Sequence, residues 1–406
     1  MSGPLTGYRV LDMSRVLAGP WAGQLLADLG AEVIKVERPI QGDDTRHWGP
    51  PYLKDTAGQD TKDAAYFFST NRGKQSITLD ISQPEGQQII RQLVEQADVL
   101  IENYKVGGLA KFGLDYSSLK AINPKLVYCS ITGFGQTGPY AQRPGYDFLI
   151  QGMAGLMSIT GEADDEGGSP VKVGVAVSDL FTGLYAANAI QGALLERHQS
   201  GQGQYIDLAL LDVQTAVLAN QASNYLIGDE IPQRLGNAHP NIVPYQAFAS
   251  ADGHLILAVG NDQQFQNLCN VLKQPQWADD PLYASNSARV TNRQDLCQKI
   301  AQILKARSTS EWLADLEHNQ VPCGPINRLD EVFKDPQIVA RKMLLSQAHK
   351  TAGNVSTVAN PINYSRSTLD YPHAPPELGE HTDSVLQEYL EYSEISCKKL
   401  RDKGII

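Results

Sequence analysis

Residues 8–37 read YRVLDMSRVLAGPWAGQLLADLGAEVIKVE, a strand, a helix and a second strand in succession. The short apolar runs at 8–12 and 32–37 are typical of buried strands. Between them, residues 20–29 predict a helix that Gly30 ends. Because strands joined through a helix pair in parallel, this stretch predicts a parallel sheet.

The same alternation continues over the first half of the chain. Further strands are predicted at 76–80, 98–101, 126–131 and 204–210. Pro84 suits the first position of a helix, and a long helix is predicted from Ser178 to Arg197, with Gly201 past its end. We therefore predict an α/β fold with a Rossmann-like parallel sheet covered by helices on both faces.

The pattern changes near residue 225. Residues 235–241 have loop composition, residues 253–259 predict a strand, and helices are predicted from Asp262 and over 292–305. Ser308 and Glu311 have the spacing of a capping box. We predict a large domain at 1–224, a smaller α+β domain at 225–328, and a C-terminal part at 329–406 that completes the large domain.

Composition narrows the function classes. The 406-residue chain is 42% hydrophobic and 19% charged, which is typical of a globular protein, and its net charge is -11. This charge argues against general nucleic-acid binding but allows a small anionic ligand. The chain has neither a signal-peptide pattern nor an apolar run of the ~20 residues that a membrane span needs, so we expect a cytoplasmic protein, or an organellar one that has lost its leader. Five scattered cysteines, without a CxxC pair, suggest neither a metal site nor a disulfide framework.

A glycine motif at 133–138 imitates a nucleotide site. Gly133, Gly135 and Gly138 match the GxGxxG pattern after a predicted strand. A dinucleotide site needs a helix that opens there, whereas Pro144-Gly145 follows at once. We therefore predict a loop whose backbone comes close to some ligand, and no NAD site.

Asp179 is the candidate catalytic residue. It lies at the start of the long predicted helix, where the helix dipole favours the charged form of a carboxyl. An ionised carboxylate in a dry cleft can attack an activated acyl group. The alternative is a capping turn, with Ser178 as the N-cap and Asp179 as a first-turn acid.

Several short motifs, in their order and spacing, resemble class III CoA-transferases, the family of the formyl-CoA:oxalate and carnitine enzymes and of the alpha-methylacyl-CoA racemases. These motifs lie at 15–20, 30–39, 42–46, 71–74, 102–104, 133–139, 178–180 and 378–382. Within the family, residues 224–228 and 242–248 are most similar to succinyl-CoA:glutarate enzymes. The resemblance implies transfer of CoA to a free dicarboxylic acid and an interlocked homodimer. It also implies that a CoA thioester is the substrate and that no cofactor is tightly bound.

The resemblance also assigns residues. It places the nucleophile on Asp179, and it places the contacts to CoA on Val16, Arg38, Leu79, Asn103, Lys111 and Tyr146. Candidates for the acid substrate and the reaction's oxyanion are Gly236, His239, Arg15, Arg46 and Arg72. Leu17, Lys111 and Pro144 depart from the formyl-CoA:oxalate pattern, which puts oxalate specificity in doubt.

Two other functions remain open on the sequence. A racemase on the same fold needs two proton-transfer groups, and the racemases place a His-Asp pair where this chain has Tyr146-Asp147. A tyrosine is a poor base near neutral pH, which favours transfer. A non-catalytic CoA-binding subunit would not need Asp179.

Overall fold

The computed structural model describes residues 3–369 and 371–406. The chain forms two compact units. The first comprises residues 1–156, 173–222 and 336–406, and the second comprises 157–172 and 223–335. Segment 157–172 thus groups with the second unit, although the sequence placed it within the large domain.

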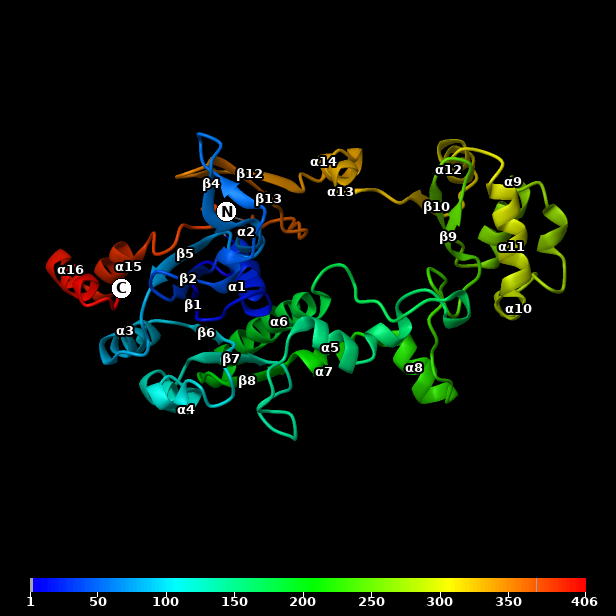
Figure 1. Cartoon of the computed structure of the whole chain (residues 1–406). Coiled ribbons are helices and arrows are strands. Elements are labelled where there is room, and N and C mark those ends of the chain that lie inside the picture. Colours follow the sequence, from blue (N-terminus) through cyan, green and yellow to red (C-terminus); the bar gives the residue numbers. More distant parts are fainter. Residues whose placement is uncertain (1–2, 370) are drawn as a thin grey trace. The chain divides into compact units, whose positions relative to one another are not determined.

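A six-stranded parallel sheet forms the centre of the first unit (Figure 1). Its order is β5-β2-β1-β6-β7-β8, and every pair is parallel. The strands are β1 (Arg9–Asp12), β2 (Glu32–Glu37), β5 (Lys74–Thr78), β6 (Val99–Glu102), β7 (Val127–Thr132) and β8 (Tyr205–Ala209). The prediction of a parallel α/β sheet is confirmed, and the order is that of a dinucleotide-binding sheet.

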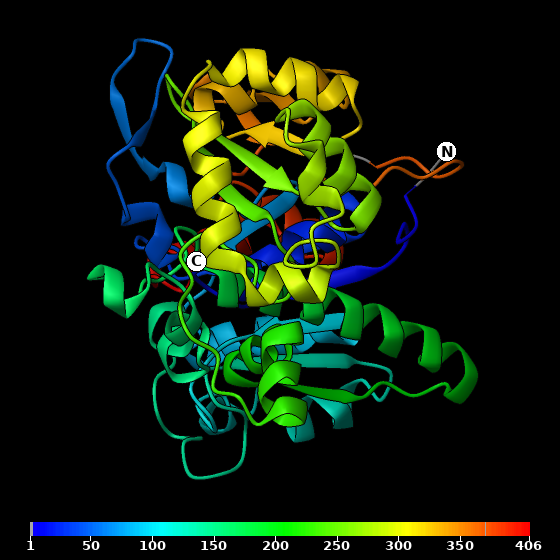
Figure 2. The same ribbon diagram turned by 90° about the vertical axis from the view of Figure 1, so that its right-hand side faces the viewer.

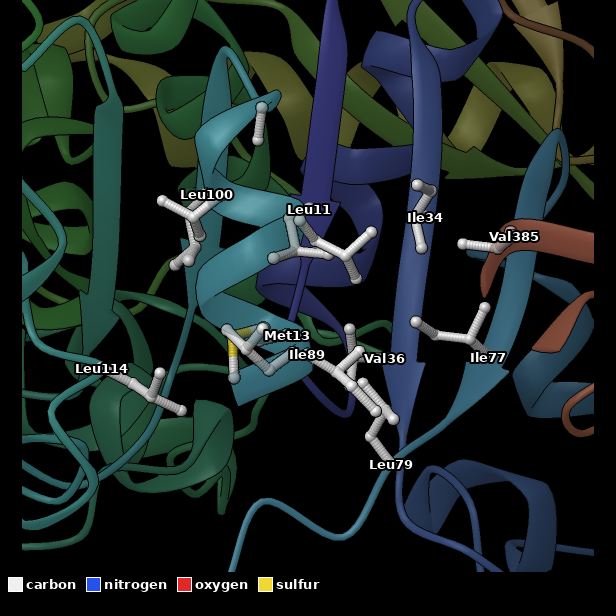
Figure 3. Close-up of a cluster of buried hydrophobic side chains, with 14 of the residues drawn as sticks. Leu11, Met13, Ile34, Val36, Ile77, Leu79, Ile89, Leu100, Leu114 and Val385 are labelled. Carbon is white, nitrogen blue, oxygen red and sulfur yellow. The ribbon is translucent and has the colours of Figure 1, made fainter. Parts of the chain in front are cut away.

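Helices cover both faces of this sheet because the strand side chains alternate. In β1, Val10 faces the layer that contains α1 (Ala18–Asp28) and α6 (Val177–Ser200). Leu11 faces the opposite layer, which contains α3 (Pro84–Glu95), α4 (Tyr116–Ile122), α15 (Thr382–Leu390) and α16 (Glu394–Asp402). Figure 3 shows the hydrophobic core that contains Leu11, on this opposite face of the sheet. The C-terminal segment therefore completes the core of the first unit.

Helix ends follow the local sequence in most places. Pro84 begins α3, and Gly201 ends α6 in the left-handed conformation at φ 74°. The expected N-cap at Ser178 is wrong, because α6 begins one residue earlier and Ser178 Oγ donates to Gln214 Oε1 at 2.7 Å. Ser178 is buried, so its hydroxyl serves packing between α6 and α7 (Leu210–Ala216).

The first unit has two further hairpins and several short helices. The hairpins pair β3 (Tyr52–Lys54) with β4 (Asp60–Ala64) and β12 (Leu344–His349) with β13 (Gly353–Val358). The remaining α-helices of this unit are α2 (Ala65–Phe68), α5 (Asp147–Met153) and α14 (Pro336–Ala340), and α8 (Ala219–Gly228) crosses the boundary between the units. The described part of the chain contains no helix with the length and apolar character that a bilayer crossing requires.

The second unit has its own sheet and core (Figure 2). Its antiparallel strands have the order β11-β10-β9, with bounds Cys323–Pro325, His254–Ala258 and Tyr245–Ala249. Its helices are α9 (Asp262–Val271), α10 (Asn286–Thr291), α11 (Arg293–Leu304), α12 (Thr309–His318) and α13 (Leu329–Val332). The predicted capping box of Ser308 and Glu311 is confirmed at the start of α12.

Candidate active site

A cavity of about 440 Å³ lies at the carboxyl ends of the central strands. The turn after β1 and the segment after β6 both line it. These neighbouring strands are the point where the strand order reverses, which is where open α/β sheets bind ligands. The structure gathers five predicted site residues around this cavity: Arg15, Val16, Asn103, Tyr146 and Asp179.

Asp179 reaches the cavity from the first turn of α6. Helix α5, whose first residue is Asp147, lies beside α6 (Figure 1). Asp147 Oδ1 accepts hydrogen bonds from the backbone N–H groups of Ser178 at 2.8 Å and Asp179 at 3.3 Å. Its Oδ2 accepts from Gln151 Nε2 at 2.7 Å, so Asp147 supplies the cap of α6 from another helix.

This arrangement raises the pKa of Asp179. Burial, followed by the negative charge of Asp147, raises the pKa of the Asp179 carboxyl from 3.8 to about 7. The sequence had predicted the opposite direction, from the helix dipole. The direction is opposite because burial disfavours the charged carboxylate, and because Asp147 already occupies the positive end of α6 and repels a second negative charge there.

The turn after β1 is fixed by side chains beneath it. Asn103 Oδ1 accepts from the backbone N–H of Arg15 at 2.9 Å, and Asn103 Nδ2 donates to the carbonyl oxygen of Arg15 at 2.7 Å. The amide of Asn103 thus holds the turn from both sides. The next residue, Val16, has a left-handed backbone with φ 73°.

Cationic groups surround one end of the cavity. Asp44 accepts from Arg15 at 2.8 Å and from Arg38 at 3.0 Å, so one carboxylate holds two guanidinium groups. Arg143 also lines the cavity, with its guanidinium 4.6 Å from the ring centre of Tyr140. Arg15, Lys105 and Arg143 line the cavity together with the carboxyl groups of Asp44 and Asp179, and Arg38 contacts Asp44. Asp44 already accepts from two of these cations, so the group as a whole favours an anionic ligand at this end.

Arg38 does not itself line the cavity but contacts Asp44, which does, and four other predicted residues of the first unit lie elsewhere. Leu79 is 1% exposed and belongs to the core of Figure 3. Lys111 is exposed on the protein surface, with its ammonium 4.6 Å from the ring centre of Phe112. Both side chains have environments that are ordinary for their type: the leucine lies in a hydrophobic core and the lysine on the surface.

Arg46 and Arg72 are held in buried ion pairs. Arg46 is 1% exposed and makes a two-point contact with Glu37, at 2.7 and 2.8 Å. Arg72 is 2% exposed and makes the same kind of contact with Asp28, at 2.7 and 3.0 Å. Arg72 also borders a separate, mainly apolar cavity of about 890 Å³. Because their guanidinium groups are committed to these carboxylates, we withdraw both as candidates for binding the acid substrate.

Gly236 and His239 belong to the second unit. Gly236 has φ 57°, which favours glycine, and a Cβ there would lie 2.4 Å from Glu162 Oε2 and displace that carboxylate. The ring of His239 lies 5.2 Å from that of Tyr245, and its Nδ1 accepts from the backbone N–H of Asn241. Burial and the nearby Arg293 lower the pKa of His239, which favours the neutral ring.

The glycine motif has a structural explanation. The segment that follows β7 remains irregular until α5 begins at Asp147. A Cβ on Gly133 would lie 2.4 Å from the Cα of Gly145, so the two backbones touch at this point. Gly133 lines the cavity from a loop after the fifth strand of the sheet, whereas a dinucleotide fingerprint follows the first.

Sequence reasoning named Asp147 only in the comparison with racemases, without its role at the start of α6, and it missed the aromatic residues Trp48 and Tyr66. Asp147 had a usable signal, since an acid directly after Pro144-Gly145-Tyr146 suits the first turn of a helix. Trp48 lines the cavity, and its ring lies 5.3 Å from that of Tyr66. Tyr66 lines the neighbouring apolar cavity, and burial, and then the charge of Asp179, raises the pKa of its phenol to about 12. Neither aromatic residue stands in a pattern that distinguishes it from a core residue.

Comparison with known proteins identifies the family. The sequence model described as CoA-transferase family III matches residues 5–382. The chain is 55% identical over 385 residues to the succinate–glutarate CoA-transferase of Agrobacterium fabrum, covering 95% of each protein. It is 43% identical over 403 residues to the human succinyl-CoA:glutarate CoA-transferase, covering 99% of this chain and 90% of that protein. The crystal structure of a CAIB/BAIF family protein from Brucella suis superposes with a TM-score of 0.84 at 51% identity, covering 96% of this chain and 100% of that one. The predicted resemblance is thus confirmed, and the chain belongs to CoA-transferase family III.

Proposed function

We propose that this enzyme moves CoA from succinyl-CoA or glutaryl-CoA to a free dicarboxylic acid, with Asp179 as the nucleophile. The observation that carries this proposal is the position of the Asp179 carboxyl, in the wall of a cavity at the reversal point of the sheet. The relatives named above supply the class of acid. The CoA thioester is a substrate, and the reaction needs no tightly bound cofactor.

The proposed reaction has four balanced steps. An oxygen of the Asp179 carboxylate attacks the thioester carbonyl and expels CoA thiolate, which leaves a mixed anhydride. The thiolate attacks the aspartyl carbonyl, releases the donor acid as its carboxylate and leaves an aspartyl–CoA thioester. The acceptor carboxylate attacks that thioester and forms a second mixed anhydride. The released thiolate then attacks the acceptor's carbonyl, which gives the new acyl-CoA and regenerates Asp179.

The charge state of Asp179 controls the first step. Only the carboxylate is nucleophilic, and its pKa of about 7 leaves roughly half of the free enzyme active at neutral pH. A carboxylate that is poorly stabilised by its surroundings is also a stronger nucleophile than a well-solvated one. When the anhydride forms, the aspartyl group becomes neutral. The repulsion between the Asp147 and Asp179 carboxylates then ends, which favours this step.

The groups around the cavity suit the two ends of CoA. Arg38 and Arg15, linked through Asp44, would bind phosphate oxygens, and Arg143 adds a further cation. Val16, Asn103 and Tyr146 would line the path of the pantetheine, with Asn103 acting through the turn that it holds. Leu79 and Lys111 stay in the proposal only through family resemblance. Of the three arginines predicted to bind the acid, only Arg15 lines the cavity, so it would bind either the phosphate region of CoA or the distal carboxylate of the acid.

The wider assembly is proposed on the same resemblance. We expect an interlocked homodimer in the cytoplasm, with domains at 1–224, 225–328 and 329–406. Gly236 and His239 are proposed to face the reacting carbonyl, where a backbone N–H beside a glycine would stabilise the oxyanion. Light scattering on the purified protein tests the proposed dimer. The expected mass is about twice the 44.3 kDa of one chain.

A panel of acyl-CoA donors against free acids, read by mass spectrometry, tests the substrate class. Succinyl-CoA or glutaryl-CoA with the reciprocal acid should give the fastest exchange. Exclusive use of formyl-CoA with oxalate would refute the assignment. A parallel incubation of a chiral 2-methylacyl-CoA in heavy water, without acceptor acid, should leave the alpha carbon free of deuterium, since deuterium uptake would indicate a racemase.

The covalent intermediate can be trapped. Reaction with donor acyl-CoA followed by hydroxylamine should convert Asp179 to the hydroxamate, which adds about 15 mass units to its peptide, the difference between hydroxylamine and water. Asp179→Ala is the control and should show no such shift. A wild-type enzyme that turns over without ever yielding this adduct would contradict the mechanism.

A further inference from the structure

The turn after β1 contains a strained residue. Val16 lines the cavity and has φ 73°, in the left-handed region. A β-branched residue rarely adopts this conformation, because its Cβ substituents crowd the neighbouring carbonyl oxygen. Such strain persists only where the surrounding structure enforces it.

Three side chains hold the backbone of this turn, one for each consecutive residue. Lys35 Nζ donates to the carbonyl oxygen of Ser14 at 3.0 Å, and Asn103 contacts both backbone groups of Arg15. Asp43 accepts from the backbone N–H of Val16, with both carboxylate oxygens 3.3 Å from the nitrogen. The contacts therefore fix three consecutive residues, and Asp43 is the side chain that holds the strained one.

Lys35 and Asp43 form a fully buried ion pair. Their side chains are 0% exposed, and Lys35 Nζ lies 2.9 Å from Asp43 Oδ2. Burial opposes ionisation, but Lys35 and the N–H of Thr45 lower the pKa of Asp43 to about 2, so the carboxylate is charged under all ordinary conditions. A buried ion pair is a poor source of net stability, so its direct contacts with the turn point to a role in conformation.

We propose that Asp43, fixed by Lys35, is a positioning residue that holds Val16 in the left-handed conformation and so sets the turn that lines the cavity beside Asp179. Where activity is the readout, the inference rests on the proposed CoA transfer. The strain is the property that makes it testable, because glycine adopts φ 73° without cost. A glycine at position 16 should make the turn independent of Asp43.

The experiment is a double-mutant cycle of Asp43→Asn and Val16→Gly. With Val16 present, Asp43→Asn should raise KM for acyl-CoA about tenfold, and in the Val16→Gly background the same change should raise it less than about threefold. Glu391→Gly is the matched control, since Glu391 also has a left-handed backbone (φ 57°) but ends α15. In that background the full effect of Asp43→Asn should remain. Equal effects of Asp43→Asn with and without the Val16→Gly substitution would overturn the proposal.

A second readout does not depend on activity. Amide hydrogen exchange of the peptide containing residues 14–18, without substrate, should speed up about tenfold on Asp43→Asn and much less when residue 16 is glycine. If the Asp43→Asn variant does not fold, the double variant Lys35→Met/Asp43→Asn takes its place in the cycle. This double variant removes both charges of the buried pair, so that neither is left without its partner. If the folded Asp43→Asn variant shows unchanged amide exchange at residues 14–18, the positioning role is overturned, even if the enzyme transfers CoA. If exchange is faster but the wild-type enzyme transfers no CoA, only the proposed function is refuted.

Discussion

Asp179 and Asp147 form a pair of carboxyl groups with different tasks. Asp147 caps α6, and its charge contributes to the raised pKa of Asp179. Between about pH 6 and pH 8 the ionised fraction of Asp179 should therefore rise about tenfold. We expect the rate constant for acylation of the enzyme, measured in single-turnover experiments, to rise with pH through a midpoint near 7.

Asp147→Asn separates the two causes of that midpoint. Asparagine can still accept the hydrogen bond from Ser178 N–H but carries no charge. The midpoint of the pH profile should shift to lower pH, while burial keeps it above 3.8. An unchanged profile would mean that Asp147 has no electrostatic influence on the nucleophile.

The raised pKa also predicts a stability effect. A carboxyl whose pKa is 3.8 unfolded and about 7 folded leaves stability unaffected below pH 3.8, lowers it progressively between these values, and lowers it fully above pH 7. Asp179→Asn should therefore abolish transfer and raise the free energy of unfolding at pH 8 by on the order of 2–4 kcal/mol. Denaturant unfolding at about pH 4 and pH 8 tests this, since the gain should nearly vanish at the lower pH.

At the scale of elements, the buried Arg46 connects β2 to the segments around it through Glu37, Asp63 and the carbonyl oxygen of Pro376. Arg46→Met would leave Glu37 buried without its cation and should lower the free energy of unfolding by about 3–5 kcal/mol. KM for the acid should not change in the folded fraction, because Arg46 lies outside the cavity. Arg38→Met is the matched comparison. It breaks an exposed pair and should cost less than about 1 kcal/mol while raising KM for acyl-CoA.

Element prediction succeeded where the pattern was local. Each strand of the central sheet was predicted within two residues of its observed bounds. The strands were recognisable because helices bury both faces of the sheet, so that successive residues of a strand are apolar. The start of α6 was misjudged because its cap, Asp147, comes from a different helix. Arg46 and Arg72 could not be recognised as buried, since their partners Glu37 and Asp28 are paired only in the folded chain.

At the scale of the molecule, each unit has its own core. Leu268 is 0% exposed in the core of the second unit, and Leu100 is 0% exposed in that of the first. Leu268→Ala and Leu100→Ala should each cost about 2–5 kcal/mol locally. If the units unfold separately, scanning calorimetry should show two transitions, each lowered by one of the two substitutions. A single transition lowered equally by both would contradict independent units.

The cavity itself was predictable only in part. The sequence order of the strands predicts a parallel sheet, but the reversal point depends on which strands become neighbours, and β1 and β6 lie far apart in the chain. Asp179, Val16, Asn103 and Tyr146 were identified through family resemblance. Trp48, Tyr66 and the strain at Val16 became visible only in three dimensions.

The contact between Gly133 and Gly145 has a practical consequence for engineering this enzyme. Since a methyl group on either residue would collide with the opposite main chain, both codons should be held fixed in any mutant library that targets the substrate cavity. The same contact warns against labelling by short patterns, because such a pattern would assign Gly133 to nicotinamide chemistry although its lack of a side chain lets the two ends of one loop touch.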